Sequence, residues 1–326
     1  MCMDKAGIVC YNSKKEVSGM QYVYPDYYKA FKCIAGACRH NCCIGWEIDI
    51  DADTAAYYRR VPGEMGVRLR SHISDDGEPH FVLGEGERCP FLNGDNLCDI
   101  LLQLGEEHLC EICNAHPRFK NELPDRVEIG VGMACEEAAR LILSKKTKTV
   151  LVGGEESEDE IIRLRDRVIS LLQDRERSVP DRVSRMLALC GAALPDYTMG
   201  EWAEVFLDLE RLDENWTALL QDLRDGWETV DLAGFDAHSQ GRQTEYEQLL
   251  VYLVYRHFAN APDLAEAAAR AAFAALGYTL LRALGALMWT KSGAFSFADQ
   301  VELCRMFSSE IEYSDENVYV LLDVVR

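Results

Sequence analysis

Nine cysteines in the region 33–135 are the residues of this sequence most able to do chemistry. They form two groups, 33–43 and 89–98, which are followed by Cys110, Cys113 and Cys135. Thiolates are soft ligands that bind zinc, copper(I) or iron–sulfur clusters, and four of them complete a tetrahedral zinc site or hold one cubane cluster. Nine cysteines exceed that requirement. The pattern therefore predicts a metal centre and leaves open whether there are one or two.

The spacing of these cysteines excludes several simple sites. A ferredoxin run is absent, and a radical-initiating loop after Cys38 and Cys42 would need a cysteine where the sequence has Gly45. A zinc ribbon is excluded because only Cys110 and Cys113 have the two-residue spacing of a zinc knuckle. The adjacent Cys42 and Cys43 point in different directions, which suits two centres, or one centre and one core position. Buried thiols in a small core remain the alternative to metal binding.

The elements that must position these cysteines differ between two parts of the chain. Residues 1–150 are rich in turn residues and contain short strand-like pieces such as 46–51. Residues 151–326 contain amphipathic helices, and the Gly-rich stretch 149–155 is interpreted as a connector. The sequence predicts a mainly α fold, with an irregular, cysteine-rich, metal-bound N-terminal segment of few short strands packed on a helical C-terminal part.

Helix boundaries are predicted from local signals. Capping boxes at Ser157–Glu160 and Thr198–Glu201 predict two helix starts, and Pro180 and Gly191 bracket another helix. Apolar periodicity predicts further helices, which cover 246–258, 264–288 and 297–311. Cys190 and Cys304 fall inside helices and are expected to be ordinary buried thiols.

Composition excludes several classes of protein. With 326 residues and 48% hydrophobic residues, the chain can bury a sizeable core. A net charge of −21 argues against binding to nucleic acid or to an anionic membrane. The N-terminus lacks an apolar stretch of signal-peptide length, and charged residues interrupt the apolar stretch 264–290. We expect a cytoplasmic protein, in which thiols stay reduced and favour metal binding over disulfides.

The cysteine blocks resemble those of a known family. The stretches 31–46, 89–92, 97–100, 113–118 and 135–141 resemble, in this order, the blocks of the flagellin lysine-N-methylase family. This family belongs to a wider group of zinc- or iron-chelating cysteine-cluster proteins. Weaker matches lie at 246–253 and 307–312. The family pattern has eight cysteines, which match Cys33, Cys38, Cys42, Cys43, Cys89, Cys98, Cys113 and Cys135.

Three positions depart from or add to the family pattern. Cys110 is an additional cysteine, Glu136 replaces a common proline, and His116 stands where an aromatic residue is more frequent. Neither replacement removes a thiol. The resemblance implies an enzyme that transfers a methyl group from S-adenosylmethionine to lysine side chains of flagellin or a similar surface protein. It also implies a [4Fe–4S] cluster, with zinc as the alternative metal.

Methyl transfer to lysine requires a neutral amine and a site for a cationic donor. The alternating segment from Trp46 predicts a short strand with Asp49 and Asp51 on one face, where they could guide a cation; a solvated face is the alternative. Trp46 and His116 are candidates for donor binding. Arg118 could bind the carboxylate of the donor or take part in catalysis, or it forms a structural salt bridge.

Two other functions compete with a methyltransferase. The first is a non-enzymatic interaction module in which zinc or an iron–sulfur cluster only stabilises the fold. The second is a thiol redox protein that uses Cys110 and Cys113, although the βαβ context of a thioredoxin-like fold is missing. Binding of S-adenosylmethionine and labelling of lysines would distinguish the enzyme from the module.

Overall fold

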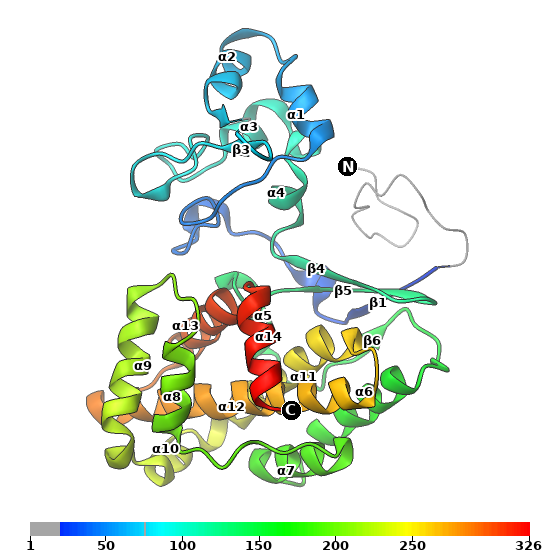
Figure 1. Cartoon of the computed structure of the whole chain (residues 1–326), viewed down its shortest axis with the longest axis vertical. Coiled ribbons are helices and arrows are strands. Elements are labelled where there is room, and N and C mark those ends of the chain that lie inside the picture. Colours follow the sequence, from blue (N-terminus) through cyan, green and yellow to red (C-terminus); the bar gives the residue numbers. More distant parts are fainter. Residues whose placement is uncertain (1–19, 75) are drawn as a thin grey trace. The chain divides into compact units, whose positions relative to one another are not determined.

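The chain forms two compact units in the computed structural model, which describes residues 20–74 and 76–326 (Figure 1). The first unit contains residues 32–119, and the second contains 20–31 together with 120–326. Residues 120–150, which the sequence analysis grouped with the cysteine-rich part, therefore belong to the second unit. The N-terminal residues 1–19, which bear on the expected absence of a signal peptide, lie outside the described residues. The fold is 59% helical and 9% strand, which confirms the mainly α prediction.

The first unit is built from short elements joined by turns. Its helices are α1 Ala52–Tyr58, α2 Gly63–Ser71, α3 Asp99–Leu104 and α4 Glu111–Ala115. Its strands β2 Ile73–Ser74 and β3 His80–Phe81 pair in antiparallel fashion. Single 3₁₀ turns lie at Ala35–Ala37, Glu85–Glu87 and Glu106–His108. Elements this short cannot bury a large core of their own, as expected for a cysteine-rich segment that needs additional stabilisation.

The strand predicted at 46–51 is reduced to one bridge between Asp49 and His80. The alternation itself is confirmed, because Ile48 and Ile50 are buried whereas Asp49 is exposed. The pairing ends there because Asp51 is the N-cap of α1, so the chain turns into a helix instead of continuing a strand.

The second unit contains a four-stranded sheet in the order β4-β5-β1-β6. The strands are β1 Gln21–Pro25, β4 Arg118–Glu122, β5 Arg126–Val131 and β6 Leu151–Val152. β1 is parallel to β5 and antiparallel to β6. The first two residues of β4 belong to the first unit, so the chain passes between the units within this strand. The stretch 149–155, predicted as a connector, thus contributes a short edge strand.

Ten helices complete the second unit among the described residues. They are α5 Glu136–Ser144, α6 Glu160–Leu172, α7 Val179–Cys190, α8 Met199–Leu207, α9 Glu214–Gly226, α10 Leu232–His238, α11 Gln243–His257, α12 Leu264–Ser292, α13 Phe297–Phe307 and α14 Asp315–Val324. Helix α12 is long and apolar enough to cross a membrane, but 83% of its most apolar window is buried inside the fold. This burial is typical of a core helix and agrees with the predicted buried helix at 264–288.

Most of the helix ends predicted from local sequence signals are confirmed. Helix α7 runs from its N-cap Ser178 to Gly191 in the left-handed conformation, and α8 has the predicted capping box at Thr198. The other predicted capping box was misplaced by two residues. Asp159, not Ser157, caps α6, because its carboxylate accepts the first free N–H groups, while the Ser157 hydroxyl accepts the N–H of Asp159. Of the two helix cysteines, Cys304 is buried as expected but Cys190 is half-buried at the end of α7.

The helix predicted at 297–311 changes geometry before its end. α13 ends at Phe307 and continues as a π-helical turn, Ser308–Glu312. A π turn closes its hydrogen bonds over five residues instead of the four of an α-helix, and it is often found at functional positions. This turn buries two carboxylates, Glu310 and Glu312.

Candidate functional site

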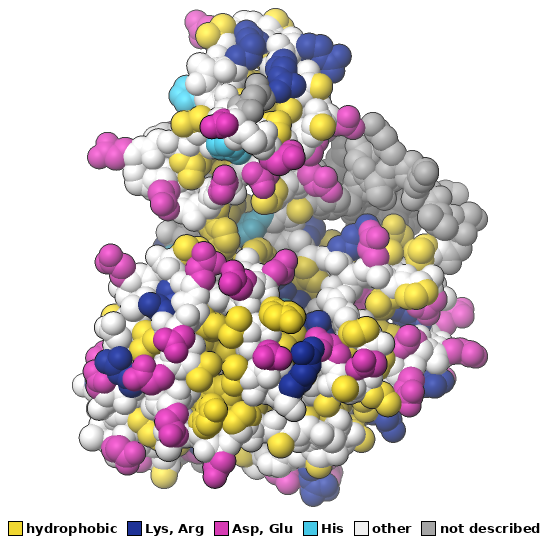
Figure 2. Space-filling view, in the orientation of Figure 1, with side chains coloured by type: hydrophobic (Ala, Val, Ile, Leu, Met, Phe, Trp, Pro, Cys, Tyr) yellow, Lys and Arg dark blue, Asp and Glu magenta, His cyan; other side chains and the backbone are white. Residues whose placement is uncertain are grey.

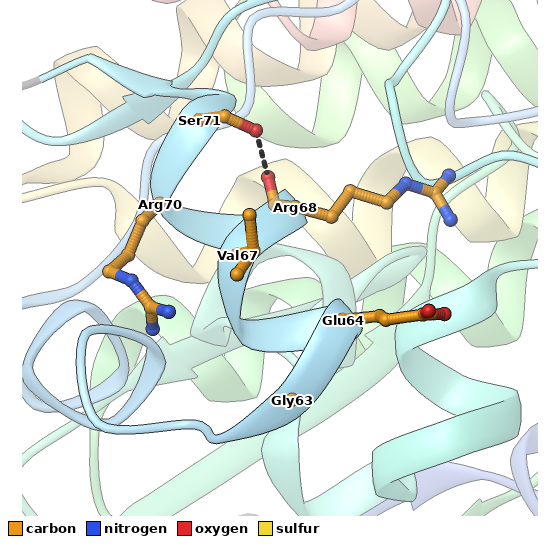
Figure 3. Close-up of a pocket in the computed structure, with 6 residues that line it drawn as sticks. All are labelled: Gly63, Glu64, Val67, Arg68, Arg70 and Ser71. Carbon is orange, nitrogen blue, oxygen red and sulfur yellow. Dashed lines mark hydrogen bonds between the residues drawn. The ribbon is translucent and has the colours of Figure 1, made fainter.

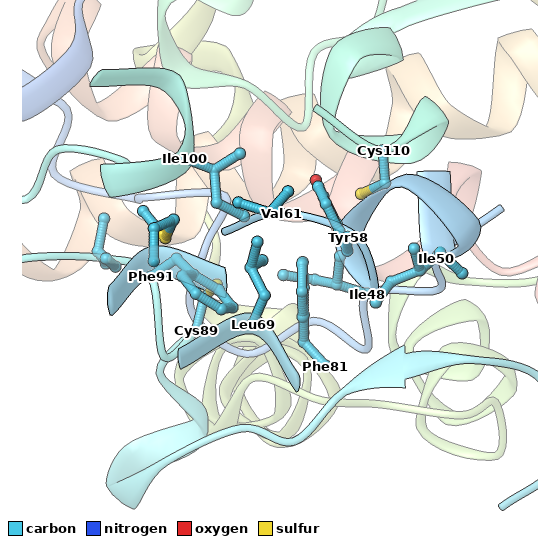
Figure 4. Close-up of a cluster of buried hydrophobic side chains, with 13 residues drawn as sticks. Ile48, Ile50, Tyr58, Val61, Leu69, Phe81, Cys89, Phe91, Ile100 and Cys110 are labelled. Atoms are coloured by element: carbon cyan, nitrogen blue, oxygen red, sulfur yellow. The ribbon is translucent and has the colours of Figure 1, made fainter. Parts of the chain in front are cut away.

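Five cysteines lie in or against the hydrophobic core of the first unit, and Figure 4 shows two of them, Cys89 and Cys110. Cys89 and Cys110 are fully buried among side chains such as Leu69 and Phe91, and three more pack against this core: Cys43, Cys98 and Cys113. Three of the predicted blocks, centred at 43, 89–98 and 113, therefore converge on one place. In the part of the chain that the structure describes, no three His, Cys, Asp or Glu side chains are already arranged around one metal position.

Two of the convergent groups are hydrogen-bonded thiol pairs. The Cys43 thiol donates to the Cys42 sulfur, which lowers the pKa of Cys42 to about 7 and raises that of Cys43. The Cys113 thiol likewise donates to Cys110, so the pKa of Cys110 is lowered and that of Cys113 is raised. In each pair one thiol therefore loses its proton more readily than its partner, and a bound metal cation would favour the loss of both protons.

Charge links these pairs to the remaining core cysteines. After its bond to Cys42 and its burial, the pKa of Cys43 is raised further by Cys89 and Cys98. We call Cys42, Cys43, Cys89, Cys98, Cys110 and Cys113 the six-thiol cluster; Cys42 is exposed, whereas the other five lie in or against the core. Several thiolates in an apolar core repel one another and lose hydration, and both costs fall when a cation binds. The chemistry of this donor set fits zinc or an iron–sulfur cluster, so the residues present fit the implied metal.

Backbone amides also point at the sulfurs. The N–H groups of Phe91 and Leu92 donate to Cys89, although burial dominates and raises the pKa of this thiol to about 11. The N–H groups of Ile100 and Leu101 donate to Cys98 in the same way, and burial again leaves its pKa above the ordinary value. Such N–H···S bonds stabilise thiolate ligands and tune the metal that they hold.

The two cysteine loops are joined through their backbones. The Cys89 N–H donates to the Cys43 carbonyl at 2.8 Å, and Leu92 forms a bridge with Cys98. Within the second loop, the side chain of Asn93 accepts the N–H groups of Asp95 and Leu97, both at 3.0 Å. These bonds hold the Cys89–Cys98 loop closed and set the position of both sulfurs.

The remaining predicted ligands lie elsewhere. Cys33 is exposed and its sulfur accepts the Ala35 N–H at 3.3 Å, while the half-buried Cys38 donates to the His40 carbonyl. Cys135 belongs to the second unit, where it is the N-cap of α5. Their role as ligands stays a prediction. Conversely, Cys110 was set aside as an additional residue, although its two-residue spacing from Cys113 was a usable signal.

The acidic candidates have different surroundings. Asp49 is exposed, whereas both oxygens of Asp51 accept backbone N–H groups, those of Thr54 and Glu111. Burial raises the pKa of Asp51, but these bonds outweigh it and leave the pKa below the ordinary value. Asp51 is therefore ionised, and both of its oxygens are occupied by backbone N–H groups. Trp46, the aromatic candidate of the same segment, is half-buried.

His116 and Arg118 lie at the end of the first unit. His116 is the C-cap of α4, and Arg118 begins β4. Burial, and then the charge of Arg118, lowers the pKa of His116 to about 4. His116 is therefore neutral at physiological pH, so any charge that attracts an anion at this point comes from Arg118.

An open hollow of about 570 Å³ lies on α2 (Figure 3). It is lined by Gly63, Glu64, Val67, Arg68, Arg70 and Ser71. The two guanidinium groups point to different sides in Figure 3, because Arg68 bonds to Asp99 and Arg70 donates to the Val61 carbonyl at 3.0 Å. None of the predicted site residues lines this hollow.

The second unit contains a buried polar network around Glu312. His257 Nε2 lies 2.7 Å from Glu312 Oε1, and the Tyr252 hydroxyl donates to Oε2 at 3.0 Å. Arg256 donates to the same hydroxyl at 2.9 Å, and the hydroxyl also accepts the N–H of Met133 at 3.1 Å. In the sequence these residues stand out only as weak family matches at 246–253 and 307–312, with no predicted role. A buried network that satisfies these groups stabilises a unique packing.

Comparison with known proteins identifies the helical part. Residues 196–326, which contain α8–α14, match the family described as FliB lysine N-methylase C-terminal domain. A lysine-N-methylase of Salmonella typhimurium is 30% identical over 128 residues, which is 37% of this chain and 32% of that protein. The flagellar biosynthetic protein FliU of Salmonella muenchen is 29% identical over 128 residues, 37% of this chain and 75% of that protein. No solved structure matches the chain.

The matched region covers about a third of the length of the Salmonella lysine-N-methylases. The cysteine blocks resemble the same kind of protein, a lysine N-methylase. Two separate parts of the chain therefore point to one kind of protein. Residues 196–326 are thus similar to the C-terminal domain of the FliB lysine N-methylase family.

Proposed function

We propose that this protein is a protein-lysine N-methyltransferase that acts on flagellin or a similar lysine-bearing surface protein, with S-adenosylmethionine as the methyl donor. The observation that carries the proposal is the match of residues 196–326 to the FliB lysine N-methylase C-terminal domain. The names of the Salmonella relatives, lysine-N-methylase and a flagellar biosynthetic protein, support both the reaction and the substrate class.

The reaction itself sets requirements for the chain. The lysine nitrogen attacks the sulfonium methyl carbon, the N–C bond forms as the S–C bond breaks, and S-adenosylhomocysteine leaves. The amine must first lose its proton, although its ordinary pKa is about 10.4. A net charge of −21, with carboxylates spread over the visible face of both units (Figure 2), supports attraction of a lysine-rich substrate.

Few residues are available for these tasks. The exposed Asp49 is a better candidate than Asp51 for contact with a substrate lysine, since both Asp51 oxygens are engaged. Trp46 could offer an aromatic face to the sulfonium, and Arg118 could bind the carboxylate of the donor. His116 is neutral and could hydrogen-bond the donor without adding charge.

The six-thiol cluster would hold a [4Fe–4S] cluster or, as the second metal that this donor set fits, zinc. When bound, the metal group would neutralise the thiolates and cross-link the loops that carry them. A reducing cytoplasm, which we propose as the location, keeps these thiols available. The protein residues supply the donor sulfurs, the N–H···S bonds and the apolar wall formed by side chains such as Phe91.

The test is purification without air, followed by iron, sulfide and zinc analysis and by a transfer assay with methyl-labelled S-adenosylmethionine and flagellin. The Cys89→Ser and Cys98→Ser variants should lose metal, whereas Cys190→Ser, a half-buried thiol of the second unit, should keep it. Label on flagellin lysines supports the enzyme.

Two results would change the proposal. A metal-loaded protein that neither binds S-adenosylmethionine nor labels lysine would be a metal-stabilised interaction module. A colourless protein that carries zinc without iron or sulfide would rule out the iron–sulfur cluster and leave methyl transfer to be judged from the labelling assay alone.

A further inference from the structure

A single carboxylate joins the starts of two helices in the first unit. Asp51 Oδ1 accepts the N–H of Thr54 in α1 at 3.0 Å, and Oδ2 accepts the N–H of Glu111 in α4 at 2.9 Å. The first N–H groups of a helix have no partner within it, so each bond satisfies a donor that would otherwise need water. Sixty residues separate Asp51 from Glu111, so this pair of bonds ties two distant segments together.

Helix α1 also contacts His108, three residues before Glu111, at two points. The Tyr58 hydroxyl donates to the His108 carbonyl at 2.7 Å, and the Tyr57 ring stacks on the His108 imidazole with centroids 4.2 Å apart. Tyr58 is completely buried, so its position leaves little freedom. The backbone from His108 to Glu111 is therefore anchored on both sides of Cys110.

Cys110 itself lies in the hydrophobic core that also contains Cys89 (Figure 4). Only 1% of its surface is exposed, so its thiol can meet only groups within this core. Cys89 belongs to the same core, and Cys98 and Cys113 pack against it. The anchored segment thus places Cys110 in the core against which Cys43, Cys98 and Cys113 also pack.

We propose that Cys110 is a ligand of the metal centre and that Asp51 is the positioning residue that sets its place. The inference rests on the metal centre of the proposed function and does not depend on methyl transfer. Residues that orient a metal ligand typically contribute 10- to 100-fold in metal affinity. Removal of the Asp51 carboxylate should therefore weaken metal binding by about 10-fold or more.

The experiment uses the full chain, reduced and metal-free, titrated with cobalt(II) without air. Cobalt–thiolate absorption grows with the number of cysteine ligands, so its intensity reports the ligand set and its titration reports affinity. Cys110→Ser should lower the intensity at saturation. Asp51→Ala should weaken binding, Asp51→Asn should be intermediate because it keeps one acceptor oxygen, and Asp49→Ala, in the same segment but exposed, should match the wild type.

Thiol accessibility keeps the inference testable if Asp51→Ala does not fold. In metal-free Asp51→Asn, alkylation of Cys110 followed by mass spectrometry should be faster than in the wild type, while the buried Cys304 serves as an internal reference. If the wild type binds no cobalt through thiolates, the metal centre of the proposed function fails. If the wild type binds it and Cys110→Ser has the same intensity, or Asp51→Ala and Asp51→Asn have the same affinity and Cys110 reactivity, this inference alone is overturned.

Discussion

Replacing Glu312 with glutamine should destabilise the second unit by about 3 kcal/mol. The side chains of Glu312 and Arg256 are buried, and His257 Nε2 lies 2.7 Å from the carboxylate. Burial alone would raise the pKa of Glu312, but the charge of Arg256 and the bond from His257 outweigh it and lower the pKa from 4.5 to about 2. That difference corresponds to about 3 kcal/mol, within the range measured when one partner of a buried ion pair is removed.

The same pKa shifts give the sign of the pH dependence. The unfolded chain protonates Glu312 near pH 4.5, whereas the folded chain keeps it ionised to about pH 2. Its stabilisation is therefore complete above pH 4.5 and is lost as the pH falls towards 2. Burial lowers the pKa of His257 below its ordinary 6.5, more than the bond to Glu312 raises it. The folded state therefore resists protonation of His257 as well, and stability begins to fall below about pH 6.5.

The assay is urea unfolding followed by tryptophan fluorescence from pH 7 to pH 3. Four of the five tryptophans lie in the second unit, so the signal reports mainly on that unit. Glu312→Gln should show the loss at pH 7, with a smaller further loss than the wild type between pH 4.5 and pH 3. The control is Glu316→Gln, an exposed carboxylate four residues away, which should stay within about 0.5 kcal/mol.

The reasoning would be refuted if Glu312→Gln and Glu316→Gln had the same free energy of unfolding at pH 7. It would also fail if Glu312→Gln kept the acid sensitivity of the wild type below pH 4.5. Either result would mean that Arg256 and His257 find other partners when the carboxylate is removed.

Three further substitutions can be measured in the same unfolding assay. Glu247→Gln leaves the buried Arg182, 2.8 Å away, without its carboxylate, and we expect a loss of about 3 kcal/mol; a loss below about 1 would contradict this. Gly153→Ala should cost more than about 1 kcal/mol, because Gly153 has a φ of +94° and an added Cβ would lie 2.2 Å from the Tyr22 carbonyl oxygen. The control is Gly241→Ala, whose added Cβ meets open space. Equal losses of stability in the two variants would contradict this prediction. Thr198→Ala removes the N-cap of α8 and should cost about 1 kcal/mol, and Thr198→Ser should restore it.

The helical half was largely predictable because its signals are local. Ser178, Gly191 and Thr198 act on backbone groups within four residues, so the ends of α7 and the start of α8 could be read from sequence neighbours alone. The sheet was not predictable in this way. β1 pairs with β5, and Tyr22 lies opposite Val127, more than a hundred residues along the chain. No local pattern encodes such a partner.

The clustering of cysteines along the chain is visible in the sequence, but which of them converge in the fold is not. Spacing indicates which cysteines are close along the chain, but the fold decides which sulfurs meet. It brings Cys110 into the core with Cys89 and leaves Cys33 exposed on its loop. Asp51 illustrates the same limit. Period-two alternation groups Asp51 with Asp49 on one face of a strand. In the structure Asp51 instead caps α1 by accepting the N–H of Thr54, a bond that the alternation does not predict.

The Glu312 network also connects the C-terminal domain to the segment that carries Cys135. The Tyr252 hydroxyl, on α11, accepts the N–H of Met133, and Cys135 follows two residues later as the N-cap of α5. The ring of Tyr313, next to Glu312, lies 4.8 Å from the Arg256 guanidinium. Burial raises the pKa of Tyr313, and Cys135 makes a smaller contribution in the same direction. The π turn that buries Glu312 therefore holds the turn at Met133 through the Tyr252 hydroxyl, which bonds to both.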